Sequence, residues 1–269
     1  MELFFKYQWL LMPLIVFLSF WIRYMFIAGL MYKFLYVWKK GKYLKRKNQL
    51  NFPEKEQIKY EFKWSISSAL VMGFVGTIVY YFYKNGYTKI YENISDYGWL
   101  YFVFSIIIMM FIHDIYFYFV HRLLHTKFMW NVHKIHHSSH NPTPWSSFCM
   151  HPVEMLLSGG VVAPMIFIIP AHMSAFVVFT LIIMFNAIYG HCGFEFFGPG
   201  FNKSIFLKWI NTETFHNMHH SGKHVNYGLY TNIWDRICQT VHKDYDIEYE
   251  KVVSRTSVED PHEEEKTTK

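Results

Sequence analysis

Residues 99–125 read WLYFVFSIIIMMFIHDIYFYFVHRLLH. Positions 99–120 are almost all apolar, and about 20 such residues in a helix cross the hydrocarbon layer of a membrane. The stretch ends in His121 and His125, which lie four residues apart and therefore share one face of a helix. It predicts a membrane-spanning helix whose end presents a pair of imidazoles.

Other apolar segments lie on both sides of this one. Segments 7–31 and 64–83 are also long enough to span a membrane, whereas 155–170 and 173–190 are shorter and are separated by Pro170. The short pair predicts a membrane hairpin that crosses fully or only partly, although 155–170 alone could be a buried helix. Apolar residues make up 52% of the chain, more than is usual in soluble domains. We expect an all-α, multi-pass membrane helical bundle of three long spans plus a hairpin, with a histidine-rich helical cap.

The basic residues are concentrated in one loop. Between Lys33 and Lys63 there are ten Lys or Arg residues against three Glu, whereas the segment from Lys84 to Gly98 has two Lys and two acids. By the positive-inside rule the first loop is cytoplasmic. Following the chain through the spans then places both histidine-rich segments and the C-terminus on the cytoplasmic face. The net charge of the chain is +6. We interpret the basic residues of this loop as a topology signal whose side chains also contact anionic lipid, and not as a nucleic-acid site.

The chain is expected to have three parts. Residues 1–98 form membrane anchor helices with the basic loop, and residues 99–242 form a catalytic histidine domain. Residues 243–269 form a polar tail, disordered beyond about residue 252, because the tail has few apolar side chains to bury. The first apolar segment lacks a small-residue cleavage site, which predicts a retained anchor. The three cysteines are widely scattered and predict neither a disulfide framework nor a zinc site.

Histidines are the feature that points to chemistry. Of sixteen in the chain, eleven lie in three compact groups: His113, His121 and His125; His133, His136, His137 and His140; His216, His219, His220 and His224. The motif His-x-x-His-His occurs twice, as HKIHH at 133–137 and HNMHH at 216–220, and on a helix this spacing directs three imidazoles to one place. Histidine is the commonest metal ligand. Because a tetrahedral zinc ion uses four ligands, eight or more histidines predict two metal ions.

Acidic side chains near these motifs are expected to orient the ligands. A metal-bound histidine usually donates its second ring N–H to a carboxylate, a carbonyl or water. We assign this role to the nearby acids, although an acid near a helix end can equally be a cap or a solvated charge. The acids concerned are Asp114, Glu154, Glu195, Glu213 and Asp235. The isolated His172 and His262 are interpreted as ordinary structural residues.

Several motifs together suggest a family. They are HRLLH at 121–125, HKIHH at 133–137, HPVE at 151–154, HCGFE at 191–195, FHNMHH at 215–220 and NYGLYTNIWDRICQT at 226–240. Over roughly residues 100–242 the chain resembles the fatty acid hydroxylase and sterol desaturase superfamily of integral membrane di-iron enzymes. The resemblance implies two iron ions, O2 as co-substrate and a lipid substrate that is hydroxylated or desaturated. The ligands that it implies are His121, His125, His133, His136, His137, His191, His216, His219 and His220.

The resemblance also guides the neighbouring positions. The family sometimes has one further ligand shortly before the position of His191, where this chain has Asn186 and no histidine. His113 lies two helical turns before His121, so we leave it out of the ligand set. The residues expected beside the metals or in the substrate slot include His140, His151 and His224. The slot itself is expected between the aromatic run 101–119 and the hairpin.

Other functions remain open at this point. A haem-binding membrane protein would place isolated histidines deep within spans, and a membrane metal-binding or transport protein would place ionisable residues along a path through the bilayer. A di-zinc hydrolase is a third alternative. For the favoured oxygenase, no cytochrome-like or ferredoxin-like segment is recognisable, so a separate donor of the cytochrome b5, ferredoxin or reductase type is expected. The lipid could be a sterol, a fatty acyl chain, a sphingolipid, a carotenoid or an ether lipid.

Overall fold

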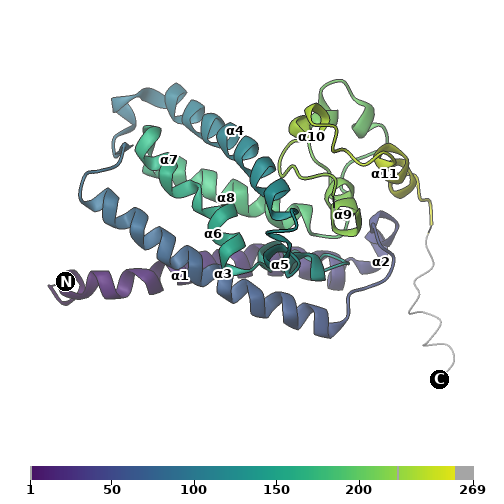
Figure 1. Ribbon diagram of the computed structural model, residues 1–269, viewed down its shortest axis with the longest axis horizontal. Helices are drawn as coiled ribbons and strands as arrows, with labels where there is room; N and C mark the ends of the chain where they lie inside the picture. Colours follow the sequence, from purple (N-terminus) through teal and green to yellow (C-terminus); the bar gives the residue numbers. More distant parts are fainter. Residues whose placement is uncertain (1, 223, 258–269) are drawn as a thin grey trace.

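The computed structural model describes residues 2–222 and 224–257 and is almost entirely helical. Long helices lie side by side, and short helical segments gather at one end of this bundle (Figure 1). The long helices are α1 (Glu2–Tyr32, continued by the π-helical turn η1, Lys33–Trp38), α3 (Lys55–Lys84), α4 (Gly98–Leu124) and α8 (Met173–Gly190). The predicted all-α class is confirmed.

Four helices are long and apolar enough to cross a membrane: Gln8–Trp38, Lys55–Lys84, Gly98–Leu124 and Met173–Gly190. Their outward faces carry exposed large apolar side chains, such as Phe26, Phe74 and Leu100. Exposed apolar surface of this extent is stable in lipid and not in water. The chain is therefore an integral membrane protein, as expected.

The hairpin consists of α6 (Pro152–Gly160), α7 (Val162–Ile168) and α8. The helix breaks between α6 and α7 because Pro164 has no N–H to donate to the carbonyl of Gly160. At the turn, β2 (Ala171–His172) pairs in parallel with β1 (Ile90–Tyr91), which lies in the loop between α3 and α4. This turn lies at the end of the bundle away from the C-terminal helices (Figure 1). The hairpin therefore runs along α4 to its far end.

Two contacts fix the bundle around the loop that follows the first histidine motif. Helices α1 and α3 approach closely at Gly73, where an added Cβ would lie 2.9 Å from the carbonyl oxygen of Pro13. The 3-10 helix η5 (Pro144–Phe148) is held against both helices. The Tyr24 hydroxyl donates to the Trp145 carbonyl at 2.7 Å, and the Ser68 hydroxyl donates to the Phe148 carbonyl at 2.8 Å. These bonds place the loop at the end of the spans.

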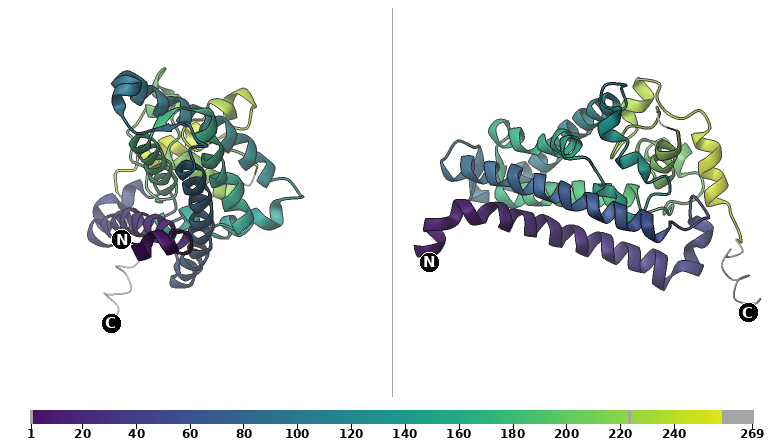
Figure 2. Two further views of the ribbon diagram at one scale, coloured as in Figure 1. Left: turned by 90° about the vertical axis from the view of Figure 1, so that its left-hand side faces the viewer. Right: turned by 60° about the horizontal axis from the view of Figure 1, so that its bottom comes forward.

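Short elements form the cap. They are α2 (Lys40–Tyr43), η2 (Leu44–Arg46), α5 (Trp130–His133), η4 (His136–Ser138), η6 (Phe201–Lys203), η7 (Leu207–Trp209), α9 (Glu213–Gly222), α10 (Ile233–Ile237) and α11 (Tyr245–Val253). One further short helix, η3 (Ile94–Asp96), lies in the loop between α3 and α4 and is not part of the cap. Figure 2 shows the remaining elements gathered where α4 and α8 end.

The first part of the predicted polar tail, before the point near residue 252 where disorder was expected, is helical and packs into the cap. Residues 245–253 form α11, whose Tyr245 and Tyr249 are buried against Phe215 of α9. The aromatic residues recur at a spacing of four, so a polar segment still presents one apolar face. Residues 258–269, with His262, lie outside the described residues. The division at residues 98 and 242 stays a prediction.

Candidate metal centre

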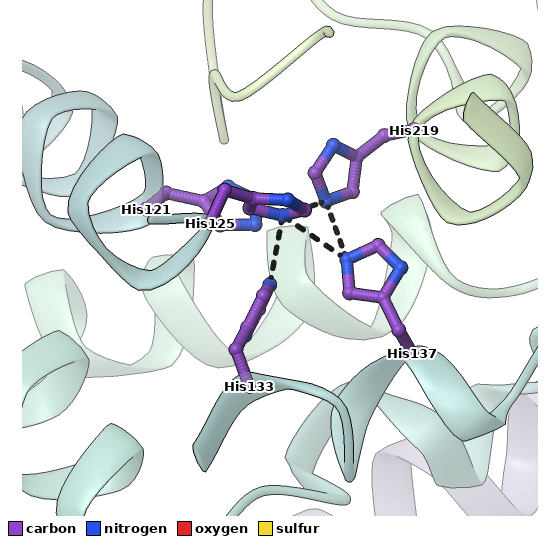
Figure 3. A group of neighbouring side chains, drawn as sticks. All are labelled: His121, His125, His133, His137 and His219. Atoms are coloured by element: carbon purple, nitrogen blue, oxygen red, sulfur yellow. Dashed lines mark hydrogen bonds between the residues drawn. The ribbon is translucent and has the colours of Figure 1, made fainter. Parts of the chain in front are cut away.

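Five histidines converge in a first group, shown in Figure 3: His121, His125, His133, His137 and His219. They come from α4, α5, η4 and α9, and one ring nitrogen of each lies within 4.8 Å of the others. The Nε2 atoms of His133 and His125 are 3.0 Å apart, and those of His137 and His219 are also 3.0 Å apart. All five side chains are buried.

Four further histidines form a second group: His136, His191, His216 and His220. They come from η4, the end of α8 and α9. The Nε2 of His191 lies 3.1 Å from that of His136 and 2.9 Å from that of His216. All nine histidines that the resemblance implied as ligands therefore lie in these two groups, and His113 lies in neither.

The prediction that each His-x-x-His-His motif directs three imidazoles to one place is wrong. In the second motif, His216 and His220 join the second group while His219 joins the first. Consecutive residues of a helix differ by about 100° in direction, so His219 and His220 diverge. His136 and His137 diverge in the same way in the first motif. Each motif therefore contributes to both groups.

Backbone carbonyls hold the second ring nitrogen of four of the nine histidines. Nδ1 of His121 lies 2.8 Å from the carbonyl oxygen of Tyr227, and Nδ1 of His219 lies 2.6 Å from that of Val225. In the second group, Nδ1 of His191 lies 2.7 Å from the Ala187 carbonyl oxygen. Each of these bonds fixes the proton on Nδ1 and leaves Nε2 with a lone pair that points into its group.

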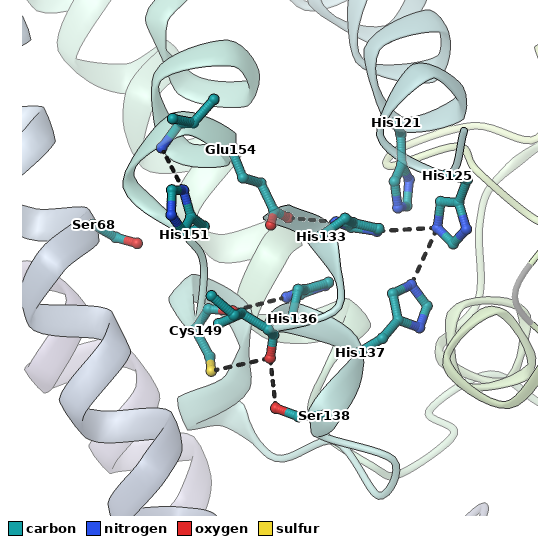
Figure 4. Close-up of polar contacts among 12 residues, drawn as sticks. Ser68, His121, His125, His133, His136, His137, Ser138, Cys149, His151 and Glu154 are labelled. Atoms are coloured by element: carbon teal, nitrogen blue, oxygen red, sulfur yellow. Dashed lines mark hydrogen bonds and ion pairs between the residues drawn. The ribbon is translucent and has the colours of Figure 1, made fainter. Parts of the chain in front are cut away.

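One carboxylate does contact a ring. Nδ1 of His133 lies 2.8 Å from Oε1 of the buried Glu154, and Figure 4 shows this contact beside the longer one from His136 to the Cys149 carbonyl, at 3.3 Å. The predicted position of Glu154 next to a ligand candidate agrees with the structure. Its motif, HPVE, places it one turn into α6, whose first turn faces the histidines.

These contacts test whether a metal ion fits. His136 and His191 both donate through Nδ1 to a carbonyl, so their Nε2 atoms face each other at 3.1 Å as two lone pairs. Burial, and next the charge of His191, hold the pKa of His136 well below its usual range, and burial lowers the pKa of His191 to about 4. A proton therefore does not separate them at neutral pH. A metal cation would separate them, since metal–nitrogen bonds of about 2.1 Å give ligand–ligand edges of about 3.0 to 3.4 Å.

Two of the other predicted acids, Asp114 and Glu195, do not hold imidazoles as expected. Asp114 accepts from the hydroxyl of Thr231 at 2.6 Å and so ties α4 to the turn before α10. Glu195 accepts from the backbone N–H of Thr214 at 3.1 Å and stabilises the positive end of α9. In each case a nearer N–H or hydroxyl of the cap is the partner.

Asp235 contacts no imidazole directly but supports the position of His121 through the backbone. It accepts from the N–H groups of Tyr227 and Gly228, both at 2.8 Å, and so fixes the turn that presents the Tyr227 carbonyl to His121. The alternative of an acid that caps a turn was thus the right one for this residue.

The remaining predicted neighbours lie farther out. His140 and His224 are exposed, although the ring of His224 lies 5.8 Å from that of His125. The Asn186 amide donates to the carbonyl of Ile182 within its own helix. His151 accepts from the N–H of Val153 and caps α6.

Lys47 and Glu213 have roles in the cap other than those expected from the sequence. Lys47 belongs to the basic loop, which we interpreted as a lipid-facing topology signal, yet its side chain is fully buried. Its ammonium group donates to the carbonyl of Asn51 at 2.9 Å and to Oδ1 of Asn141 at 3.2 Å. Glu213, at the start of α9, accepts from the N–H of Gly193 at 3.0 Å and from the Asn48 amide. The loop therefore reaches into the cap and braces α9.

A cavity lies between the histidines and the membrane helices. Apolar side chains of α4, α6 and α8 line it, among them Phe117, Met155 and Ile183. Besides His113, histidines of both groups line it: His121, His133, His136, His191 and His216. The cavity therefore borders both groups.

Comparison with known families agrees with this site. The sequence profile described as fatty acid hydroxylase matches residues 106–240, which include all nine histidines of the two groups. The chain belongs to the fatty acid hydroxylase family. The expected superfamily, and with it an oxidoreductase that acts on lipids, is therefore confirmed.

Curated relatives cover most of the chain. Lathosterol oxidase of Rattus norvegicus is 29% identical over 222 residues, which are 81% of this chain and 70% of that protein. Lathosterol oxidase of Homo sapiens is 28% identical over 223 residues, with the same coverage of 81% and 70%. Delta(7)-sterol 5(6)-desaturase erg31 of Schizosaccharomyces pombe is 30% identical over 154 residues, 57% of this chain and 49% of that protein. No solved structure matches the chain.

Proposed function

We propose that the two histidine groups hold two iron ions and that the enzyme uses O2 and external electrons to desaturate or hydroxylate a lipid. The observation that carries this proposal is the pair of groups itself: nine buried imidazoles whose ring nitrogens converge beside an apolar cavity. Imidazole suits iron as well as zinc, and the family membership favours iron. The chemistry that bound iron supplies is the reduction of O2 coupled to removal of hydrogen from an unactivated C–H bond.

The protein's own side chains position the reactants. Carbonyls of Tyr227, Val225 and Ala187 hold three rings with Nε2 turned inward, so the orientation of these three of the nine rings is set before a metal binds. The apolar wall at Phe117 and Ile183 receives the lipid and excludes water from the reacting carbon. Because the cavity touches both groups, a bound chain or ring passes directly in front of them.

A sterol is the first lipid class to test. The relatives are named for oxidation or desaturation of sterols, and the cavity between α4 and the hairpin is lined largely by apolar side chains, which suit a lipid of that class. Desaturation removes two hydrogens from the lipid and, with two electrons and two protons, reduces O2 to two molecules of water. Hydroxylation inserts one oxygen atom and releases one molecule of water.

The electrons come from a separate donor on the cytoplasmic side. Trp130 supports an entry point at the first group, because its half-buried ring lies 5.5 Å from that of His125 and 5.4 Å from that of His137. The exposed Lys127 and Lys134 flank it and suit a donor with an acidic surface. The positive-inside rule, applied to the basic loop, supports the cytoplasmic orientation.

The alternatives are less well supported. A haem protein or a metal transporter gives no reason for two compact groups that share each His-x-x-His-His motif. Such functions are also not those of the family to which the chain belongs.

The deciding experiment combines metal analysis with lipid analysis. Purified enzyme should contain about two iron ions per chain, the number that two separate ligand groups require. Cells that express it should show one lipid class losing two hydrogen atoms or gaining one oxygen atom relative to cells that lack it. Full activity of metal-free enzyme would contradict the proposal.

A further inference from the structure

One apolar surface of the cap has no role in the proposed reaction. It is made of residues 205–210 and α10, and we name it the rim. Ile205, Phe206 and Ile237 of the rim are 70%, 82% and 65% exposed. Because these large side chains lie together on one surface and not singly, they indicate a surface that something apolar covers.

The rim is continuous with the lipid-facing side of α4. The ring of Trp234, on α10, lies 6.5 Å from that of Phe111 and 6.4 Å from that of Phe119. Both phenylalanines point outward from the membrane span, with 53% and 51% of their surface exposed. Ile237 follows Trp234 by three residues and so lies on the same face of α10.

The contact with α4 also indicates how deep the Trp234 ring lies relative to the membrane surface. Phe111 lies thirteen residues before Leu124, the last residue of α4, which is about 20 Å along the helix axis. Because α4 crosses the membrane, a side chain that reaches Phe111 extends beside the hydrocarbon part of that span. The Trp234 ring therefore lies below the membrane surface, although α10 belongs to the cap.

The backbone of the rim is suited to this environment. Irregular backbone is tolerated at membrane depth only where its polar groups are satisfied within the protein. The carbonyl of Trp209 accepts from the N–H of Asn232 at 2.9 Å, and that of Lys208 accepts from the Asn232 amide at 2.8 Å. The N–H of Ile210 donates to the Leu207 carbonyl at 3.0 Å. Hydrogen bonds within the protein thus satisfy these polar groups of the rim, which in water would bond to solvent.

Cations border the rim. The ammonium group of Lys208 and the guanidinium of Arg236 lie 5.0 Å and 5.6 Å from the centre of the Trp209 ring. Long basic side chains that cover an aromatic ring while their charge stays in water are typical of the headgroup layer of a membrane. By contrast, α11 carries Asp246, Glu248 and Glu250 around its own exposed Ile247.

We infer that the rim is inserted into the bilayer leaflet on the histidine side, with its apolar residues among the acyl chains and its cations at anionic headgroups. The occupant of this apolar surface is lipid, and neither a protein partner nor a second copy of the chain. The cap is then partly immersed in the membrane.

The test labels single cysteines with an environment-sensitive fluorophore in the full-length protein, reconstituted into bilayer nanodiscs that contain anionic lipid. Cys149 and Cys192 are buried, so the parent variant needs only Cys238→Ser to remove the more accessible thiol. Ile205→Cys and Ile237→Cys report on the rim. Ile247→Cys is the matched control, because that isoleucine is 66% exposed and lies on α11.

Labels at positions 205 and 237 should emit at shorter wavelength than the label at 247, and lipids with a quencher on the acyl chain should quench them severalfold more. If all three labels behave as in water, or all three are quenched equally, the inference is wrong. Labels at the rim that are shielded but not quenched would show that protein covers it, which also overturns the inference. The readout needs neither bound metal nor turnover, so it is independent of the proposed function.

A charge variant tests the cationic border. In the protein labelled at position 205, Lys208→Glu should lower quenching in anionic nanodiscs more than in zwitterionic ones. If Lys208→Glu lowered quenching equally in both lipids, the loss of quenching would come from local unfolding. The inferred contact between the cations and anionic headgroups would then be wrong.

Discussion

The two histidine groups differ in what surrounds them. The first contains the end of a membrane helix, has a carboxylate in direct contact through His133 and Glu154, and touches the half-buried Trp130. The second is closed around the end of α8 and is held by carbonyls, such as those of Cys149 and Ala187. The first group thus has a carboxyl partner and a half-buried tryptophan beside it. The second has neither among the contacts described, so the two groups, of five and four histidines, differ in their surroundings.

The largest expected effect comes from removing one ring from each group. His219→Ala and His220→Ala alter consecutive residues but different groups. Each should lower activity by more than about 100-fold, because even residues that only orient a ligand are worth about 10- to 100-fold. Iron analysis and lipid turnover measure the effect. His140→Ala, at an exposed histidine, is the control and should change neither.

If His220→Ala kept full activity and full iron content, the second group would not be a metal site. The comparison between the groups would then reduce to one metal centre and one buried histidine cluster.

Glu154 tests whether the carboxylate distinguishes the first group. Glu154→Gln keeps the shape but weakens the bond to Nδ1 of His133, and should reduce activity or metal affinity about 10- to 100-fold. Asp114→Asn is the matched control, since Asp114 contacts Thr231 and no ring of either group. Equal losses in both variants would point to general destabilisation of the cap.

Trp130 tests the route to the surface. Trp130→Ala should slow reduction of the metal centre by its protein donor severalfold while leaving reduction by dithionite unchanged. Stopped-flow absorbance with each reductant separates the two. Lys134→Glu should have the smaller effect, through binding of the donor, and should weaken as salt is raised. A variant that slows both reductants alike would show that Trp130 only packs the first group.

The smallest expected effect on activity comes from Glu213, which should change the pH dependence of the free energy of unfolding. Burial, and next the charge of Glu195, raise the pKa of Glu213 from 4.5 to about 8. Between these values the folded protein keeps a proton that the unfolded chain loses, so the free energy of unfolding should fall as pH rises from about 4.5 to about 8. Thermal unfolding in detergent should show this slope. Glu213→Gln should flatten it, and an unchanged slope would assign it to other groups.

The spans and the nine histidines could be predicted because side-chain type and periodicity encode them directly. An apolar run of the length of 99–120 has few alternatives, and the histidine motifs are specific to a family. We did not predict that each motif would contribute to both groups. This arrangement arises because the side chains of consecutive residues, such as His136 and His137, point in different directions.

Other features leave no mark in the sequence. The carbonyls of Tyr227 and Val225 hold rings of the first group, yet every residue has a carbonyl. The burial of Lys47 depends on carbonyl acceptors that only the folded loop brings together. The helix α11 was overlooked because a charged composition outweighed the spacing of Tyr245 and Tyr249.

The alternation of the motifs has one more consequence. His136 and His137 are joined by a peptide bond, as are His219 and His220, and each bond connects one group to the other. Consecutive Cα atoms stay about 3.8 Å apart, so the distance between the two sites cannot change unless η4 or α9 unwinds. Filling one site would order the turns that carry ligands of its neighbour. Loading should therefore be cooperative: a preparation with half its iron should contain empty and doubly loaded molecules, with few that hold a single ion.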